Sequence, residues 1–113
     1  MANHPNRSAA KVQVSAAAQG HSLVYVDGKL AAGITTDANG RWIMRRLIRD
    51  GSETKIAGDE TLNVTGIYHN AAELNRAVRL FVDDPEGVAA AWPASGFRAQ
   101  CRDAMDRLAQ ARQ

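Results

Sequence analysis

Few residues in this sequence have the type and spacing needed for catalysis or metal binding. The three histidines, His4, His21 and His69, stand far apart, each near a turn or the end of an expected element. A zinc or general-base role is open to His21 or His69, but a histidine beside a turn or helix cap is usually a surface residue, which is what we expect. The single Cys101 lies on an apolar helical stripe, so we expect a buried, inert thiol.

The sequence also lacks the motifs that hold phosphates, metals or catalytic nucleophiles. It contains no Gly-rich phosphate loop, paired-His helix, Gly-x-Ser-x-Gly elbow or Cys-x-x-Cys. Asn63-Val64-Thr65 spells a glycosylation acceptor, which we interpret as a chance match because the start of the sequence does not resemble a signal peptide. We therefore expect a non-enzymatic protein without a metal or cofactor.

Basic side chains are the remaining candidates for function. Arg41, Arg45 and Arg49 recur every four residues, and Lys29 and Lys55 flank them along the chain. Guanidinium and ammonium groups bind phosphates and carboxylates, so these five residues indicate an anionic partner. The alternative is that their aliphatic stems only cover the solvent side of a sheet.

The stretch that must position these residues runs from His21 to Gly58. Three turn dipeptides, Asp27-Gly28, Asn39-Gly40 and Asp50-Gly51, divide it into four apolar-rich runs. Asn-Gly and Asp-Gly supply the positive φ angles that tight hairpins need. The spacing therefore predicts an antiparallel meander, with Thr61 to Thr65 as a fifth, edge-type strand.

The second turn decides which side chains share a face of the sheet. A two-residue turn would place Arg41, Arg45 and Arg49 among apolar side chains, and burying unpaired charges is costly. A three-residue loop with a glycine bulge at Gly40 avoids most of this cost, so we prefer that register.

The preferred register predicts two faces of different chemistry. It opposes Thr36 to Trp42, Ile34 to Met44 and Leu30 to Ile48, and a similar bulge at Asp50-Gly51 sets Met44 opposite Ile56. The expected core face comprises Leu23, Tyr25, Leu30, Ala32, Ile34, Trp42, Met44, Ile48 and Ile56, with Arg46 as a misfit. The expected basic face carries Lys29, Arg41, Arg45 and Lys55 around Val24, Val26, Ile43 and Leu47, with Arg49 at its rim. A one-residue slip would instead expose Trp42 together with Arg46.

Three helices should follow the strands. Asn70, with Glu73 three residues later, forms a capping-box-like start, and Asp84 with Pro85 starts a short helix that runs to about Trp92. A last helix starts at Ser95. The expected apolar stripes are Leu74, Ala77, Val78 and Phe81 in the first helix, lying across the core face, and Phe97, Cys101, Ala104, Met105 and Leu108 in the last. The outer face of the last helix should carry the pairs Arg102 with Asp106 and Asp103 with Arg107.

Length and composition bound the architecture. A chain of 113 residues, 45% hydrophobic and 23% charged, is one globular domain by size. We expect an α+β fold, an antiparallel meander of four to five strands packed against a helix and followed by C-terminal helices. Residues 1–20 should form a flexible arm, in which residues 11–18 could form a short helix or strand. Residues 21–113 should form the single domain. No apolar run has the length of a membrane span, so we expect a cytoplasmic protein. We expect it to be a monomer or a homodimer.

The charges are unevenly distributed along the chain. The formal net charge is +2 and the pI is about 9.0, whereas residues 59–86 hold six acidic residues against two basic ones. Such a charge dipole permits a nucleic-acid partner or an acidic protein partner without requiring either.

Two resemblances bear on function. The opening Met-Ala-Asn-His-Pro-Asn-Arg-Ser resembles the start of small regulators carried by bacterial phages and plasmids. Gly-Arg-Trp opening the second strand of a hairpin, a further strand, and then Gly-Ile-Tyr-x-x-x-x-Glu entering a helix resemble the three-strand-plus-helix module of Apetala-type DNA-binding domains and of tyrosine-recombinase arm-binding domains. This match covers about Ile34 to Phe81. It implies a sheet in the major groove, with DNA contacts from Arg41, Arg45 and Lys55 and Arg49 as a further candidate.

These observations favour a small DNA-binding regulator of phage or plasmid type. The basic face would bind double-stranded DNA, and the N-terminal arm would supply a second phosphate contact. The alternative is a protein-interaction module, such as a phage-type inhibitor of a host enzyme or nucleoprotein complex. The acidic segment 59–86 fits this alternative better.

Overall fold

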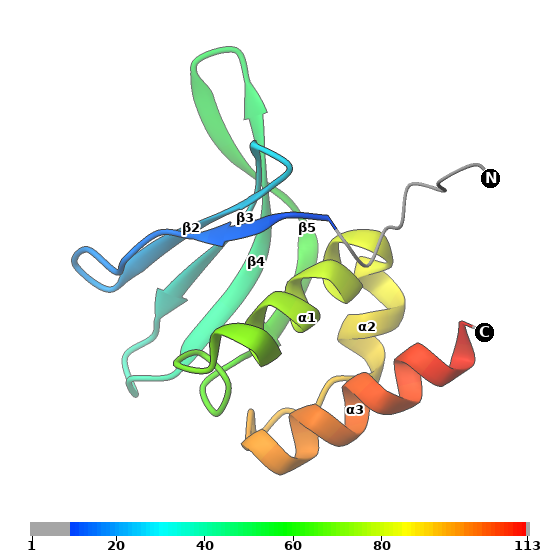
Figure 1. The fold of residues 1–113 in the computed structure, drawn as a ribbon. Helices are drawn as coiled ribbons and strands as arrows, with labels where there is room; N and C mark the ends of the chain where they lie inside the picture. The colour runs from blue at the N-terminus through cyan, green and yellow to red at the C-terminus, as the bar shows by residue number, and fades with distance from the viewer. Residues whose placement is uncertain (1–9, 113) are drawn as a thin grey trace, which may run out of the picture.

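The chain folds into an antiparallel sheet with its helices packed against one face (Figure 1). The computed structural model describes residues 10–112, so the first nine residues of the expected arm lie outside it. Within this range the elements are β1 Val12–Val14, β2 His21–Val26, β3 Lys29–Thr36, β4 Trp42–Asp50, β5 Glu53–Asn63, α1 Ala71–Asp83, α2 Pro85–Ala91 and α3 Arg98–Ala111. The strands lie in sequence order in the sheet, which confirms the α+β meander. None of the helices in residues 10–112 is long and apolar enough to cross a membrane.

The second turn forms the three-residue loop that the charge argument favoured. The backbone N–H of Asp37 donates to the Arg41 carbonyl at 2.9 Å, and Gly40 adopts a φ of 76°. The Asp37 side chain closes the loop, because its Oδ1 accepts from the Asn39 N–H at 2.9 Å and the Arg41 N–H at 3.0 Å. The expected pairs Thr36 with Trp42 and Ile34 with Met44 are confirmed.

A bulge in β3 reverses the expected faces of the first hairpin. The pairing of β2 with β3 passes from Tyr25 opposite Leu30 directly to Val24 opposite Ala32, so Ala31 is an extra residue on β3. Beyond an extra residue, every side chain changes face. The core prediction for Leu23, Tyr25 and Leu30 is therefore wrong, as is the solvent-face prediction for Val24 and Val26, because the two valines pack on the helix side.

A second irregularity shifts the last hairpin. Arg45 pairs with Thr61 and Leu47 with Ile56, so the single residue Arg46 lies opposite the four residues 57–60 of β5. Met44 therefore pairs with Leu62 rather than with Ile56. The pairing of β3 with β4 ends at Ala32 opposite Arg46, so the expected pair of Leu30 with Ile48 does not form. The fourth run of the expected meander and the start of the expected fifth strand at Thr61 form one continuous element, β5, which ends at Asn63.

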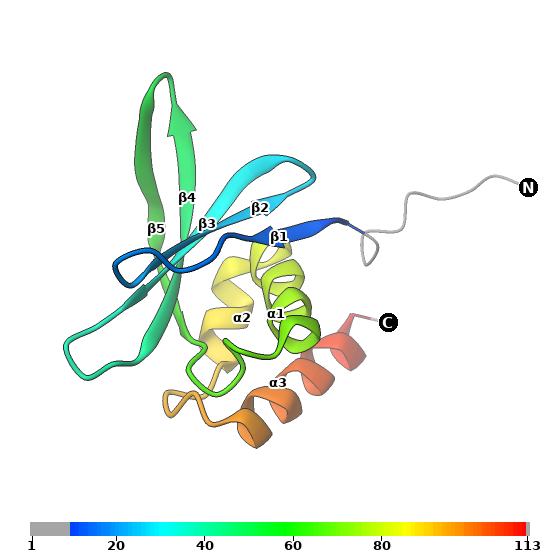
Figure 2. The same ribbon diagram turned by 60° about the vertical axis from the view of Figure 1, so that its left-hand side comes forward.

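Residues 47–56 form a hairpin that projects from the body of the molecule (Figures 1 and 2). We call it the hairpin arm. Ile48 is 48% exposed and Ile56 is 56% exposed, so their core assignment is wrong. The bulge that precedes the arm turns it beyond the reach of the helices. Arg46, the misfit of the core face, is paired at this bulge with Glu60 (Nη2 to Oε1, 2.8 Å).

The core lies between the other face of the sheet and the helices. Asn70 caps α1 by accepting from the Glu73 N–H at 3.0 Å, and Asp84 caps α2 by accepting from the Gly87 N–H at 3.2 Å, as the sequence indicates. The expected α1 stripe Leu74, Ala77, Val78 and Phe81 is buried against Val24, Ala32, Ile34, Met44 and Leu62 of the sheet. Trp42 is half-buried at the edge of this core.

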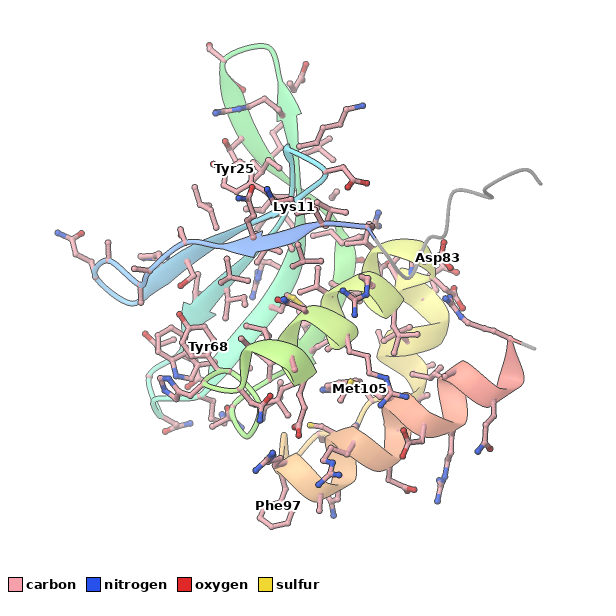
Figure 3. All side chains as sticks on the ribbon, in the orientation of Figure 1. Lys11, Tyr25, Tyr68, Asp83, Phe97 and Met105 are labelled. Atoms are coloured by element: carbon pink, nitrogen blue, oxygen red, sulfur yellow. The ribbon has the colours of Figure 1, made fainter. Side chains whose placement is uncertain are left out.

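The last helix begins at Arg98, three residues later than expected. Ser95 precedes it and accepts from the Phe97 N–H at 3.1 Å, and Phe97 itself is 64% exposed and points away from the body (Figure 3). Cys101, Ala104 and Met105 are buried as expected. Arg107 pairs with Asp103 at 2.9 Å, which confirms that pair. The other expected pair is wrong, because Arg102 turns to Glu73 (3.7 Å) and Asp106 to Arg76 (2.9 Å), both on α1.

The edge strand β1 lies within the segment expected as an arm. It pairs with β2 through Val12 opposite Val26 and Val14 opposite Val24. The strand alternative for residues 11–18 is therefore confirmed, and the described part of the arm extends the sheet by one strand.

Candidate interaction surface

The sheet face that points away from the helices has no covering layer within residues 10–112 (Figures 1 and 2). We call it the outer face. Strand alternation and register place six apolar side chains on it: Leu23, Tyr25, Leu30, Ile43, Leu47 and Ile56. Leu23 and Ile56 are 39% and 56% exposed, and the other four are partly exposed. Apolar side chains gathered on one exposed face are typical of interaction surfaces.

Arg45 lies in the middle of the outer face. It pairs with Gly33 of β3 on one side and with Thr61 of β5 on the other. The residue is partly exposed, but its Nε is buried and has no hydrogen-bond acceptor within the described chain. A buried N–H without an acceptor is uncommon and costly, more so on a charged group.

The apolar surroundings of Arg45 depend on a glycine. A Cβ placed on Gly33 would stand 2.7 Å from Cδ1 of Leu47, so the Leu47 side chain lies across the backbone of β3 where no side chain rises. Leu47 also follows Arg45 by two residues on the same face. The guanidinium therefore rises from an aliphatic surface.

Arg41 and Arg49 share the outer face but differ in their partners. Arg41 Nε contacts Asp37 Oδ2 at 2.8 Å. The hydrogen bond from the Arg41 backbone N–H, followed by the guanidinium, lowers the pKa of Asp37, so this carboxylate neutralises Arg41 near neutral pH. Arg49 donates to Thr54 Oγ1 at 3.1 Å and has no ion pair among the described residues.

The two predicted lysines do not belong to this face. Lys29 lies opposite Val26, a core-side valine, and Lys55 lies opposite Ile48 on the helix side of the hairpin arm. Lys55 Nζ is also 2.8 Å from Asp50 and 3.9 Å from Glu53. The prediction that all five basic residues share one face is therefore wrong. Only the three arginines lie on the outer face, among its apolar side chains.

An aromatic cluster closes the end of the core near the second turn. Trp42 and Tyr68 stack with ring centroids 3.9 Å apart and planes 4° apart, and His69 stands edge-on to both. The Tyr68 hydroxyl is 2.5 Å from the buried Ser22 hydroxyl. Figure 3 shows Tyr68 at the opposite end of the sheet from the hairpin arm. These side chains contact one another and the buried Ser22, so we interpret the cluster as part of the packing at the end of the core.

Within residues 10–112, no group of three or more His, Cys, Asp or Glu residues is placed to hold a metal ion. Burial, and to a smaller extent the charge of Glu73, raises the pKa of Cys101 to about 11, so the thiol is protonated and inert near neutral pH.

A shallow groove of about 310 Å³ continues the outer face around the edge of the sheet. It is lined by Ile43 and Thr61 of the sheet and by Trp92, Pro93 and Ala94, which follow α2. The Trp92 indole N–H donates to the Asn63 carbonyl at 2.9 Å, which holds this segment against β5. The outer face therefore continues into a groove that reaches the end of α2.

Comparisons with protein-family models, with curated proteins and with solved structures found no match. The resemblance to three-strand-plus-helix DNA-binding modules therefore stays a prediction, and the outer face is the basis for inferring function.

Proposed function

We propose that this chain is a non-catalytic protein-binding module whose outer face binds a partner protein. The observation that carries the proposal is the uncovered apolar patch of six side chains around Arg45. Protein interfaces combine an apolar centre with arginine and tyrosine side chains, and the outer face has this composition.

The sheet edges are less suited to binding than the face. β1 is only three residues long, and β5 is interrupted by the irregular residues 57–60, where Gly58 has a φ of 93° and Asp59 and Glu60 add charge. Short strands, bulges and charges at an edge oppose pairing with another strand. We therefore place the partner on the outer face rather than beside an edge strand.

The charges of the outer face favour a partner with acidic and apolar groups. Arg45 and Arg49 have no ion pair within the described residues, whereas Arg41 is neutralised by Asp37. Complementary charges raise association rates and select among partners. An acidic protein surface with apolar side chains is thus the partner chemistry that fits.

The test is capture of partner proteins from a nuclease-treated host lysate with matched variants. Leu47→Asp places a charge in the outer face, and Val82→Asp makes the same kind of change at a 36% exposed position on α1. We expect a partner that is retained by wild type and by Val82→Asp but lost with Leu47→Asp. Circular dichroism confirms that both variants are folded. Retention of the same proteins by all three chains, or by none, contradicts the proposal.

A second candidate, DNA binding by the same face, rests on Arg41, Arg45 and Arg49 lying on one side of β4. It is weaker because two of the five predicted contact residues lie on the other side. Phosphate contacts release counterions, so each arginine that touches a phosphate adds roughly one unit to the slope of log affinity against log salt concentration. Salt-dependent duplex binding by wild type whose slope falls by about one unit in Arg45→Ala would favour DNA over the protein partner.

A further inference from the structure

We propose that Arg45 is a receptor for one carboxylate of the partner, presented between apolar side chains. This inference rests on the proposed function and names the chemistry of the group at its centre. It begins from the guanidinium of Arg45, a partly exposed residue that has no hydrogen bond or ion pair from its side chain among the described residues. Its Nε is enclosed by the protein and out of reach of a partner, so binding falls to the two terminal NH₂ groups, which lie in one plane and match the two oxygens of a carboxylate.

No residue in the range 10–112 supplies an anion to Arg45. Asp37, at the end of the same face, is bound to Arg41, and Glu60 is bound to Arg46, with Oε1 accepting from both Nε and Nη2. In the sheet, the neighbours of Arg45 are Gly33 and Thr61, neither of which is ionisable. We therefore assign the anion to another molecule.

The isolation of Arg45 favours a group with a single negative charge. Arg41 and Arg49 are each four residues from Arg45, and a strand rises about 3.3 Å per residue, so each lies about 13 Å away along the chain. Arg41 is also held by Asp37. A phosphate monoester carries two charges and needs further donors, whereas one guanidinium fork matches one carboxylate. The apolar neighbours of Arg45 favour the carboxylate of a protein over the phosphodiester of a nucleic acid.

The apolar surroundings make this contact selective. Leu23 and Leu47 share the face with Arg45, and Leu47 lies across Gly33 beside it. A partner that covers these side chains excludes water, which strengthens a charge-assisted hydrogen bond and penalises a neutral or cationic replacement. The partner segment should therefore carry Asp or Glu flanked by apolar residues.

Displayed peptides with one fully randomised central position between randomised apolar positions provide the probe. Selection on wild type should enrich Asp or Glu at the centre, and selection on Arg45→Met should retain apolar flanks but lose the acidic preference. Arg107→Met is the matched control, because Arg107 is 78% exposed on α3, away from the outer face. Acidic enrichment that persists on Arg45→Met overturns the inference.

A double-substitution cycle with the tightest-binding peptide measures the coupling between Arg45 and the central carboxylate. Replacing its central Glu by Gln should weaken binding to wild type by roughly 10- to 100-fold and leave binding to Arg45→Met within about twofold. An equal loss on both proteins means that the carboxylate binds elsewhere, which overturns the inference while leaving the proposed function standing. Failure to enrich any peptide whose binding is sensitive to Leu47→Asp overturns both.

Discussion

The side chain of Leu47 occupies the space that a side chain on Gly33 would fill, with Cδ1 only 2.7 Å from the position of the missing Cβ. The Leu47 side chain of β4 thus packs over the backbone of the neighbouring strand β3 on the outer face. In an extended strand, Gly to Ala is usually neutral or stabilising, because alanine restricts the unfolded chain. Here the substitution must displace Leu47.

We therefore expect Gly33→Ala to destabilise the fold by about 1 kcal/mol through overpacking. Adding Leu47→Ala should remove most of that cost, so the two changes should be non-additive by about 0.5 to 1 kcal/mol. Urea unfolding of the two single variants and the double variant measures the coupling. Additive losses would mean that the two residues do not touch in solution.

The register of β4 is tested by adjacent residues with opposite orientations. Met44 is fully buried, so Met44→Lys places a charge in the core and should cost several kcal/mol. Arg45→Ala removes a side chain from the outer face and should change stability by less than about 0.5 kcal/mol. Similar denaturation midpoints for the two variants would contradict the register.

The two phenylalanines form a second matched pair. Phe81 is the largest fully buried side chain among the described residues and lies in the stripe by which α1 packs on the sheet, so Phe81→Ala should cost roughly 3 to 5 kcal/mol. Phe97 is 64% exposed ahead of α3, and Phe97→Ala should stay within about 0.5 kcal/mol. A loss below about 1 kcal/mol in Phe81→Ala would mean that α1 does not pack on the sheet.

Local turn chemistry could be predicted from the sequence, whereas the bulges could not. The loop closed by Asp37 and Gly40 depends on residues within four positions of each other, and the pairing of Ile34 with Met44 followed correctly. The run Leu30 to Gly33 has no alternation of apolar and polar residues, so nothing in it indicates that Ala31 is the extra residue.

The difference between local turns and long-range irregularities also explains which predicted site residues lie on the outer face. The sequence predicts that Arg41 and Arg45 share a face because both follow the well-defined second turn, and this agrees with the register. The prediction for Lys55 is wrong because its face depends on the irregular residues 57–60. These residues are held by long-range contacts such as the pair of Arg46 with Glu60, 14 residues apart. Long-range contacts of this kind leave no local pattern.

The ion pair between Glu73 and Arg98 predicts a pH dependence of stability. The hydrogen bond from the Arg98 side chain lowers the pKa of Glu73 below its ordinary value, more than burial raises it. The stabilisation is therefore present above the pKa of Glu73 in the unfolded chain, and it is lost as the pH falls through the lower folded-state pKa. Arg102 adds a weaker attraction at 3.7 Å.

We expect wild type to lose more unfolding free energy than Glu73→Gln between about pH 5 and pH 3. Glu86→Gln is the control, because Glu86 has no ion pair among the described residues, and its pH profile should match that of wild type. Urea titrations across this range measure the difference. A Glu73→Gln profile parallel to wild type would show that the pair contributes nothing in solution.

The hairpin arm offers the sharpest test of which face binds the partner. Ile56 lies on the outer face opposite Leu47, whereas Ile48 lies on the helix side of the same arm opposite Lys55. The two side chains are 56% and 48% exposed, so replacing either by Lys should change stability by less than about 1 kcal/mol.

Their effects on binding should differ. Ile56→Lys removes an apolar contact and places a charge where apolar side chains of the partner should pack, so binding of a captured partner or selected peptide should weaken by about tenfold or more. Ile48→Lys makes the same chemical change on the other side and should leave the dissociation constant within about twofold. Calorimetric titration of both variants measures this difference. Equal weakening by the two variants would assign binding to the arm as a whole, and a larger effect of Ile48→Lys would place the partner on the helix side of the sheet.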